Sequence, residues 1–238
     1  MKKYFLFVVS VIFFTGAFAQ KTFVNDANAE TRNLSGSFNN ITVSGGIDLY
    51  LSQYDNEAVA VSASSVEYIR NIKTIVENNT LRIFFDGGKS WNTENKKLKV
   101  YVSFKRLEKL VASGACDVQV AGMIQMPAFK LDLNGASSFK GAVKVDDLSM
   151  DLSGASDVRM NGFATAVYIQ SSGASDMKGY ELVAEVCTAK ASGASDINIT
   201  VNKELNANAS GASDIYYKGD AVIKKKNSSG ASSIVKKG

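Results

Sequence analysis

The stretch SGASD at residues 153–157 is one of seven copies of a single five-residue motif. The other copies, identical or differing at one or two positions, lie at 113–117, 134–138, 172–176, 192–196, 210–214 and 229–233. The motif glycines are separated by 21, 19, 19, 20, 18 and 19 residues. A period this short leaves no room for two helices per unit, and it is typical of the turns of a solenoid.

Residues around each motif glycine alternate between apolar and polar, as in a β-strand with one buried face. The positions four before and four after the glycine are apolar in nearly every copy: Leu110, Leu131, Met150, Ile169, Ala189 and Ala207 before it, and Val118, Phe139, Val158, Met177, Ile197, Ile215 and Ile234 after it. The positions three before and five after it are mostly polar. The sequence therefore predicts an all-β fold, a parallel β-helix with about 19 residues per turn in the C-terminal half.

The same alternation places the motif serine, two residues after the glycine, on the inward face. Cys116 takes the place of that serine in the first copy. We expect stacked serine hydroxyls to hydrogen-bond along a ladder, which would offset the cost of burying them. The aspartate that follows points outward, or it lies at a corner where its carboxylate accepts hydrogen bonds from N–H groups of the turn. The sequence leaves both arrangements open.

Successive turns would bring the motif aspartates into one row. Its candidate ligand-binding members are Asp157, Asp176, Asp196 and Asp214. Carboxylates about 4.8 Å apart repel by roughly 0.9 kcal/mol in water, so an exposed row is tolerable. A repeated turn residue explains the row without a ligand, and a strip that faces a cation or another ligand is the alternative. Serines at positions 138 and 233 and the absence of the G-G-x-G-x-D motif weigh against a metal site.

The first 19 residues have the pattern of a cleaved signal peptide. Lys2 and Lys3 precede an apolar run from Tyr4 to Phe14, and Ala17-Phe18-Ala19 forms a small-residue cleavage site. The apolar run is too short for a typical membrane span, so we expect none in the mature chain. The protein is therefore predicted to be exported, to the periplasm, the outer-membrane surface or the extracellular space.

Residues 20–106 lack the strict repeat and are predicted to form an irregular β region, continuous with the repeat array of residues 107–238. The expected strands are Phe38–Val43, Ile47–Leu51, Ala58–Ser62, Ile72–Val76, Leu81–Phe85 and Lys97–Phe104. Val66–Asn71 is a candidate helical turn, and the stretch from Ser44 to Asp48 is a degenerate motif copy. An exposed loop is expected from Asp86 to Asn95. There Trp91 would stack on a sugar ring or cover the edge of a small core.

Several kinds of chemistry are excluded or disfavoured by composition. The chain has no histidine, which excludes Ser-His-Asp and Cys-His catalysis and histidine-ligated metals. Cys116 and Cys187 would lie three or four turns apart, too far for a disulfide, so both are predicted to be free and buried. Loss of Lys2 and Lys3 lowers the net charge from +4 to +2, which argues against nucleic acid as a partner. We expect no cofactor, no metal and no catalytic residues.

The motif array resembles the auto-transporter adhesin family with a head GIN domain. Two further stretches carry the resemblance: the opening sequence FNNITVSGGIDL from Phe38 to Leu49 and the terminal SGASSI from Ser229 to Ile234. It covers nearly all of the mature chain, and it implies an exported bacterial protein with a right-handed parallel β-helix. The family brings no catalytic residues to carry over. The chain departs from it at 105–107, where Lys-Arg-Leu replaces the family's usual Pro-x-Leu.

The leading hypothesis is an exported, non-enzymatic, adhesin-like module that contacts a polysaccharide or another component of the cell envelope. Lysine-rich segments at 96–109 and 218–237 either solvate exposed strands and block edge pairing or contact anionic polysaccharide or lipid headgroups. The alternative is a polysaccharide lyase or hydrolase, with Asp157 and Arg159 as candidate groups. Self-assembly by end-to-end stacking is a third possibility, and the sequence does not determine the oligomeric state.

Overall fold

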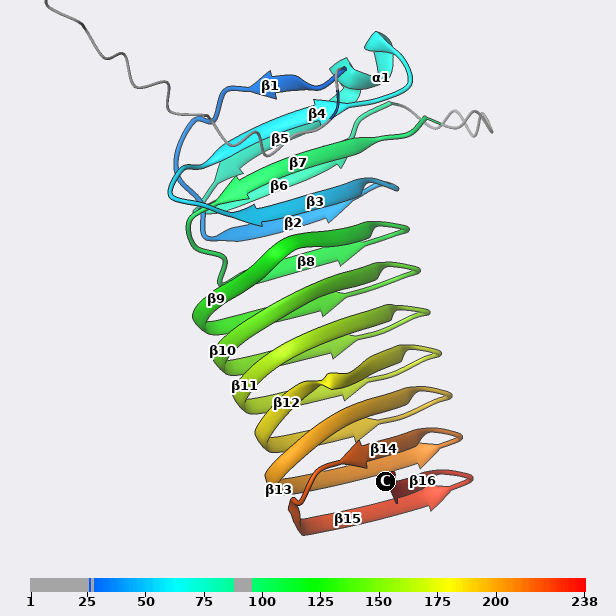
Figure 1. Cartoon of the computed structure of the whole chain (residues 1–238). Coiled ribbons are helices and arrows are strands. Elements are labelled where there is room, and N and C mark those ends of the chain that lie inside the picture. The colour runs from blue at the N-terminus through cyan, green and yellow to red at the C-terminus, as the bar shows by residue number, and fades with distance from the viewer. Residues whose placement is uncertain (1–25, 27, 88–95) are drawn as a thin grey trace, which may run out of the picture.

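The computed structural model describes residue 26 and residues 28–87 and 96–238, and it is a right-handed parallel β-helix (Figure 1). Strands account for 68% of the described residues and helix for 3%, with about 7 turns of about 19 residues in the solenoid. The predicted fold class is confirmed. The signal peptide, Trp91 and most of the predicted loop at 86–95 lie outside the described residues.

The strands of the first turns are short and those of the repeat array are long. In chain order the elements are β1 (Glu30–Arg32), β2 (Asn40–Ser44), β3 (Asp48–Gln53), β4 (Ala58–Ser62), α1 (Val66–Asn71), β5 (Ile72–Glu77), β6 (Thr80–Phe85), β7 (Lys99–Phe104), β8 (Lys109–Ser113), β9 (Asp117–Leu133), β10 (Ser138–Leu152), β11 (Asp157–Ser171), β12 (Asp176–Ala191), β13 (Asp196–Gly211), β14 (Asp214–Lys218), β15 (Val222–Gly230) and β16 (Ser233–Lys236). The six strands and the helical turn predicted before residue 107 are therefore confirmed, with ends that shift by one or two residues.

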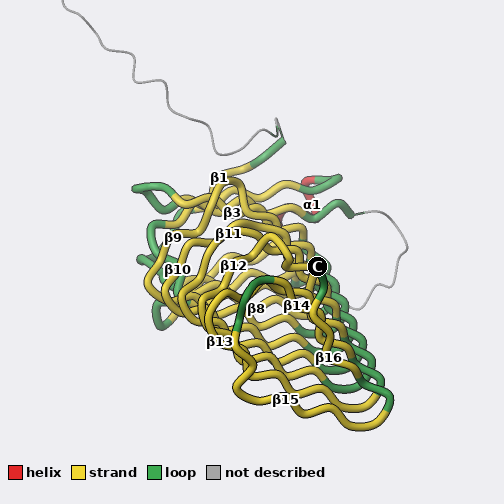
Figure 2. Tube along the Cα trace, turned by 60° about the horizontal axis from the view of Figure 1, so that its bottom comes forward, coloured by secondary structure: helices red, strands yellow, loops and turns green. Residues whose placement is uncertain are grey.

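Each long strand bends and contributes to two walls of the solenoid. The first half of β9 pairs in parallel with β3, whereas its second half pairs with β8. The first wall contains β3, the first halves of β9–β13, β14 and β16, and the second wall contains β2, β8, the second halves and β15. The motif turns join the second wall to the first, and Figure 2 shows them gathered along one edge.

The core lies between the two walls and follows the predicted alternation. Every apolar position four before or four after a motif glycine is buried, with at most 4% of any of these residues exposed. Cys116 and Cys187 are free and buried, as predicted. Burial in apolar surroundings raises the pKa of the Cys187 thiol to about 12, so this side chain is an inert part of the core.

The motif glycine is required by contact between neighbouring turns. Gly154 has a φ of +81°, and a Cβ added there would lie 2.5 Å from the carbonyl oxygen of Gly135. The same oxygen accepts a hydrogen bond of 2.7 Å from the backbone N–H of Ala155. This arrangement repeats from turn to turn, because only glycine combines a left-handed backbone with such a close approach.

The motif serines are inward and buried, but they do not form the predicted ladder of hydroxyl groups. Ser175 Oγ instead donates to the carbonyl oxygen of Ser172 at 3.0 Å and accepts from the backbone N–H of Ser156 at 3.2 Å. Ser156 makes the equivalent bond to the carbonyl of Ser153. A backbone carbonyl of the same turn lies within reach of each serine hydroxyl, and the hydroxyl donates to it instead of to the serine of the next turn. Each of these hydrogen bonds therefore links the two ends of a single tight turn.

The two ends of the solenoid differ. At the N-terminal end β4 lies antiparallel to β7 and β5 lies antiparallel to β6, which departs from the parallel array. At the C-terminal end all nine residues of β15 are exposed. Lys226 there pairs with the buried Ala207, so a lysine occupies an inward position of the last turn. A charged residue at an open core end disfavours stacking of a second copy.

Candidate functional site

The motif aspartates form the row that the sequence predicted, on the outer side of the first wall. Their strands are aligned so that the aspartates are direct partners in neighbouring turns. From the N-terminal end the row contains Asp48, Asp117, Ser138, Asp157, Asp176, Asp196, Asp214 and Ser233. Asp48 extends it by one turn, because the degenerate copy before β3 continues the stack.

The carboxylates of the row combine the two arrangements that the sequence left open. Each aspartate begins a strand and faces outward, yet several also bind groups of the adjacent turn. Asp214 Oδ1 accepts from the Ser233 hydroxyl at 2.7 Å and from the Ser233 N–H at 2.9 Å, and Tyr216 donates to Oδ2 at 2.8 Å. The Ser138 hydroxyl donates to Asp117 Oδ1 at 2.5 Å. Serines in the row therefore serve as partners for neighbouring carboxylates.

Position along the row changes the acidity of these groups. Hydrogen bonds from Ser233 and then Tyr216 hold the pKa of Asp214 below its usual value. Desolvation, followed by repulsion from Asp176, raises the pKa of Asp196. Desolvation also raises the pKa of Asp48, with a further contribution from Asp117. Within residues 28–87 and 96–238 the structure offers no cluster of three or more acidic or cysteine ligands that would hold a metal ion.

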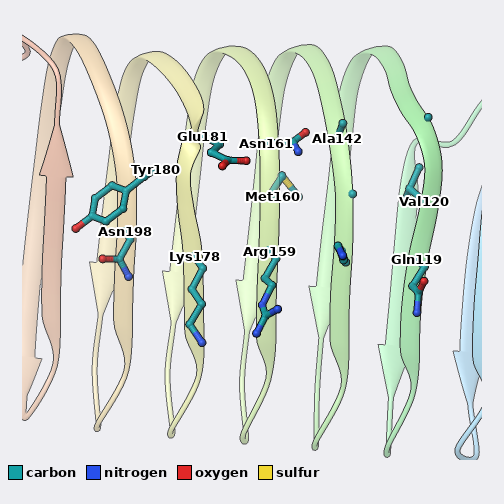
Figure 3. Close-up of a pocket in the computed structure, with 13 residues that line it drawn as sticks. Gln119, Val120, Ala142, Arg159, Met160, Asn161, Lys178, Tyr180, Glu181 and Asn198 are labelled. Atoms are coloured by element: carbon teal, nitrogen blue, oxygen red, sulfur yellow. The ribbon is translucent and has the colours of Figure 1, made fainter.

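A second outward row runs beside the aspartates, two residues further along each strand. It contains Gln119, Lys140, Arg159, Lys178, Asn198 and Tyr216. All but Tyr216 line a groove of about 710 Å³, and Figure 3 shows Gln119, Arg159, Lys178 and Asn198 projecting from the same side of their turns. The sequence showed these positions to be mostly polar, and only Arg159 among them was a candidate functional residue, for the alternative enzyme. The signal that could have revealed them is a cation at the same motif position in three consecutive copies.

The groove forms where the regular strand register breaks. Pairing of β10 with β9 shifts between Lys140 and Ala142, and pairing of β11 with β12 shifts between Arg159 and Gly162. Gly122 and Gly162 have φ values of +84° and +115°. Such bulges bend a strand and leave one residue unpaired, so the wall recedes beside the second row.

Small residues line the inner part of the groove and polar side chains form its other rim. Gly141 and Ala142 lie at the level of the bulges, with Met160 beside them. Asn161 and Glu181 project from the rim toward the strand bend (Figure 3). The groove thus offers cations on one side and amide and carboxylate groups on the other, a set suited to binding a polar ligand.

Tyr180 adds an aromatic surface at the C-terminal end of the same groove. The ammonium of Lys218 lies 5.0 Å from the centre of the Tyr180 ring. Desolvation raises the pKa of the Tyr180 phenol, and the protonated hydroxyl can donate a hydrogen bond. An aromatic face with a polar tip is a common contact for polar ligands with one apolar side.

A second groove, of about 560 Å³, lies further along the same long strands. Its lining includes Met126, Pro127, Leu148, Val167 and Tyr168, so it is more apolar than the first.

Over the described part of the chain, no helix is long and apolar enough to cross a membrane.

The family model described as "Putative auto-transporter adhesin, head GIN domain" matches residues 37–221. The chain belongs to this family. The match includes β2 through β14 and with them every aspartate of the first row and the whole second row. The resemblance found in the motif copies is therefore confirmed.

Solved structures of proteins from Bacteroides and Parabacteroides species share the fold. A "putative adhesin" from Bacteroides fragilis is 22% identical, with a TM-score of 0.79 over 89% of this chain and 98% of its own. A "putative lipid binding protein" from Parabacteroides distasonis is also 22% identical, with a TM-score of 0.68 over 90% of this chain and 98% of its own. None of the curated proteins matches the chain. At this level of identity the likeness establishes the architecture alone.

Proposed function

We propose that the protein is an exported, non-enzymatic, adhesin-like module that holds a polysaccharide or another elongated envelope component along its first wall. The observation that carries this proposal is the pair of parallel outward rows, in register over consecutive turns and bordered by a groove. A ligand that repeats along its length can meet the same side chain in each turn. Family membership and the export pattern of residues 1–19 support the same role.

Binding explains the groove better than glycoside hydrolysis does. A glycosidase needs two carboxyl groups that flank the scissile bond. Glu181 is the single carboxylate among the described residues that line the groove. The aspartates of the first row recur as parts of the repeat, and none of them lines the groove. Asp157, Asp176, Asp196, Asp214 and Trp91 are proposed as contacts to the ligand, not as catalytic groups.

The test is a panel of immobilised polysaccharides challenged with the purified mature protein, residues 20–238. Retention of intact glycan without new chain ends is the expected result. Replacing Asp157 and Asp176 by asparagine, or Trp91 by alanine, should weaken retention, because each removes a proposed contact. Release of new reducing ends, lost in the asparagine variant, would instead make the protein an enzyme. Absence of retention on every glycan would contradict the proposal.

A further inference from the structure

Three cations of the second row stand side by side in consecutive turns. Lys140 pairs in register with Arg159, and Arg159 pairs with Lys178. All three are exposed, and all three line the groove of about 710 Å³. Amide side chains continue the row on either side, with Gln119 one turn before and Asn198 one turn after.

None of these three cations has an ion-pair partner among the described residues, although an acidic row lies two positions away. Some outward lysines elsewhere do have an acidic partner. Lys109 and Lys130 both contact Asp132, at 3.0 and 3.3 Å. Like charges one strand spacing apart repel one another, and an oxyanion between them relieves that repulsion.

We propose that Lys140, Arg159 and Lys178 form a binding site for the carboxylate or sulfate groups of an acidic polysaccharide. This inference rests on the proposed function and specifies its ligand class. The guanidinium of Arg159 can bind an oxyanion with two parallel hydrogen bonds, while the two lysines act as flanking point charges. The groove receives the sugar rings, and the neighbouring aspartates accept hydrogen bonds from their hydroxyl groups.

The neighbouring rows favour an acidic glycan over other anionic partners. A membrane surface or a nucleic acid backbone presents negative charge without interruption, and the aspartate row beside the cations would repel it. An acidic polysaccharide presents hydroxyl donors between its charged groups. Asp157 and Asp176 on one side, with Asn161 on the other, match those donors. The line of cations follows the solenoid axis, as an extended chain requires.

The experiment compares the mature protein with a Lys140→Gln/Arg159→Gln/Lys178→Gln variant. Polygalacturonate is the carboxylate probe, dextran sulfate the sulfate probe, and dextran the neutral one. The matched control is Lys105→Gln/Lys144→Gln/Lys225→Gln, which removes the same charge from exposed positions outside the groove. We expect the groove variant to weaken binding of at least one anionic glycan by about tenfold per lost contact, and the control by far less. Added salt should weaken wild-type binding and have little effect on the groove variant.

Several outcomes would overturn the inference. If both variants lose affinity equally, overall charge rather than the groove is responsible. If wild type retains the neutral glycan but neither anionic one, the proposed function stands and the anionic site is wrong. If wild type binds vesicles of anionic lipid but no glycan, the partner is a lipid surface. Arg159→Lys, which keeps the charge but not the paired hydrogen bonds, should lose part of the affinity while leaving the thermal midpoint unchanged.

Discussion

At the motif edge, each turn from Gly135 to Gly230 places a glycine against the carbonyl oxygen of the motif glycine one turn before it. Along the groove, the positions at the bulges differ from turn to turn, with Gly122, Ala142, Asn161 and Tyr180 among them. One edge of the solenoid is thus fixed by contact between backbones. The other side carries whatever side chain the turn presents.

The difference explains why five residues repeat so strictly while the rest of each turn does not. A substituent on the motif glycine meets the backbone of the preceding turn, which cannot move without disturbing the whole stack. A substituent on Gly122 or Gly141, which line the groove, meets solvent or a side chain. The motif therefore determines the spacing of the turns, and the groove side is free to acquire a binding surface.

Gly154→Ala tests the comparison most severely. Gly154 and Gly122 have nearly the same φ, +81° and +84°, but only Gly154 would place a Cβ against a neighbouring backbone. We expect Gly154→Ala to lower the free energy of unfolding by at least about 3 kcal/mol, and Gly122→Ala by roughly 1 kcal/mol for the left-handed backbone alone. Denaturant unfolding measures both variants. Equal losses of stability in the two variants would mean that the close approach of Gly154 to the backbone of Gly135 has no effect on stability.

Ser175→Ala tests the hydrogen bonds that close the motif turn. It would leave the carbonyl of Ser172 and the N–H of Ser156 buried without their partner, at a cost of about 1–3 kcal/mol. Ser232 makes the same bond, at 2.8 Å to the carbonyl of Ser229, in the last and more exposed turn. Water can replace the hydroxyl there, so Ser232→Ala should cost clearly less in thermal or denaturant unfolding. A larger loss at Ser232 would refute this account.

Asp196 and Asp214 should respond to mutation and pH with opposite signs. The raised pKa of Asp196 means that its charge opposes folding, so Asp196→Asn should stabilise at pH 7, with the gain disappearing as pH falls through that raised pKa. The pKa of Asp214 is lowered in the folded protein, so its ionised carboxylate stabilises the fold at pH values above the ordinary aspartate pKa. This stabilisation is lost as the pH falls through the lowered pKa. Asp214→Asn should therefore destabilise at pH 7.

Both effects should stay below about 1 kcal/mol, because the row is largely solvated. Unfolding curves recorded from pH 3 to pH 7 measure them. If the free energy of unfolding changed with the same sign in both variants, the hydrogen bonds would not explain how the surroundings of the two carboxylates differ.

The rows of outward side chains could largely be predicted from the sequence, but the groove beside them could not. Parity and period placed Asp157 and its equivalents in one row. The groove depends on the register shift between Arg159 and Gly162, which pairs residues of unequal spacing in neighbouring turns. The sequence of a single repeat does not reveal where its strand forms a β-bulge relative to the strand of the next turn. It also gives no measure of whether Lys178 has an ionic partner.

The sequence by itself determined the solenoid, its period and the face on which each side chain lies, because strand alternation and a glycine-dependent turn are local properties of the chain. The tertiary structure decided three further features. It paired the motif serines with the turn carbonyls, placed Lys226 at the open core end, and hollowed the wall beside Lys140, Arg159 and Lys178. These features depend on contacts between turns about 19 residues apart, where a shift of one residue changes which groups meet.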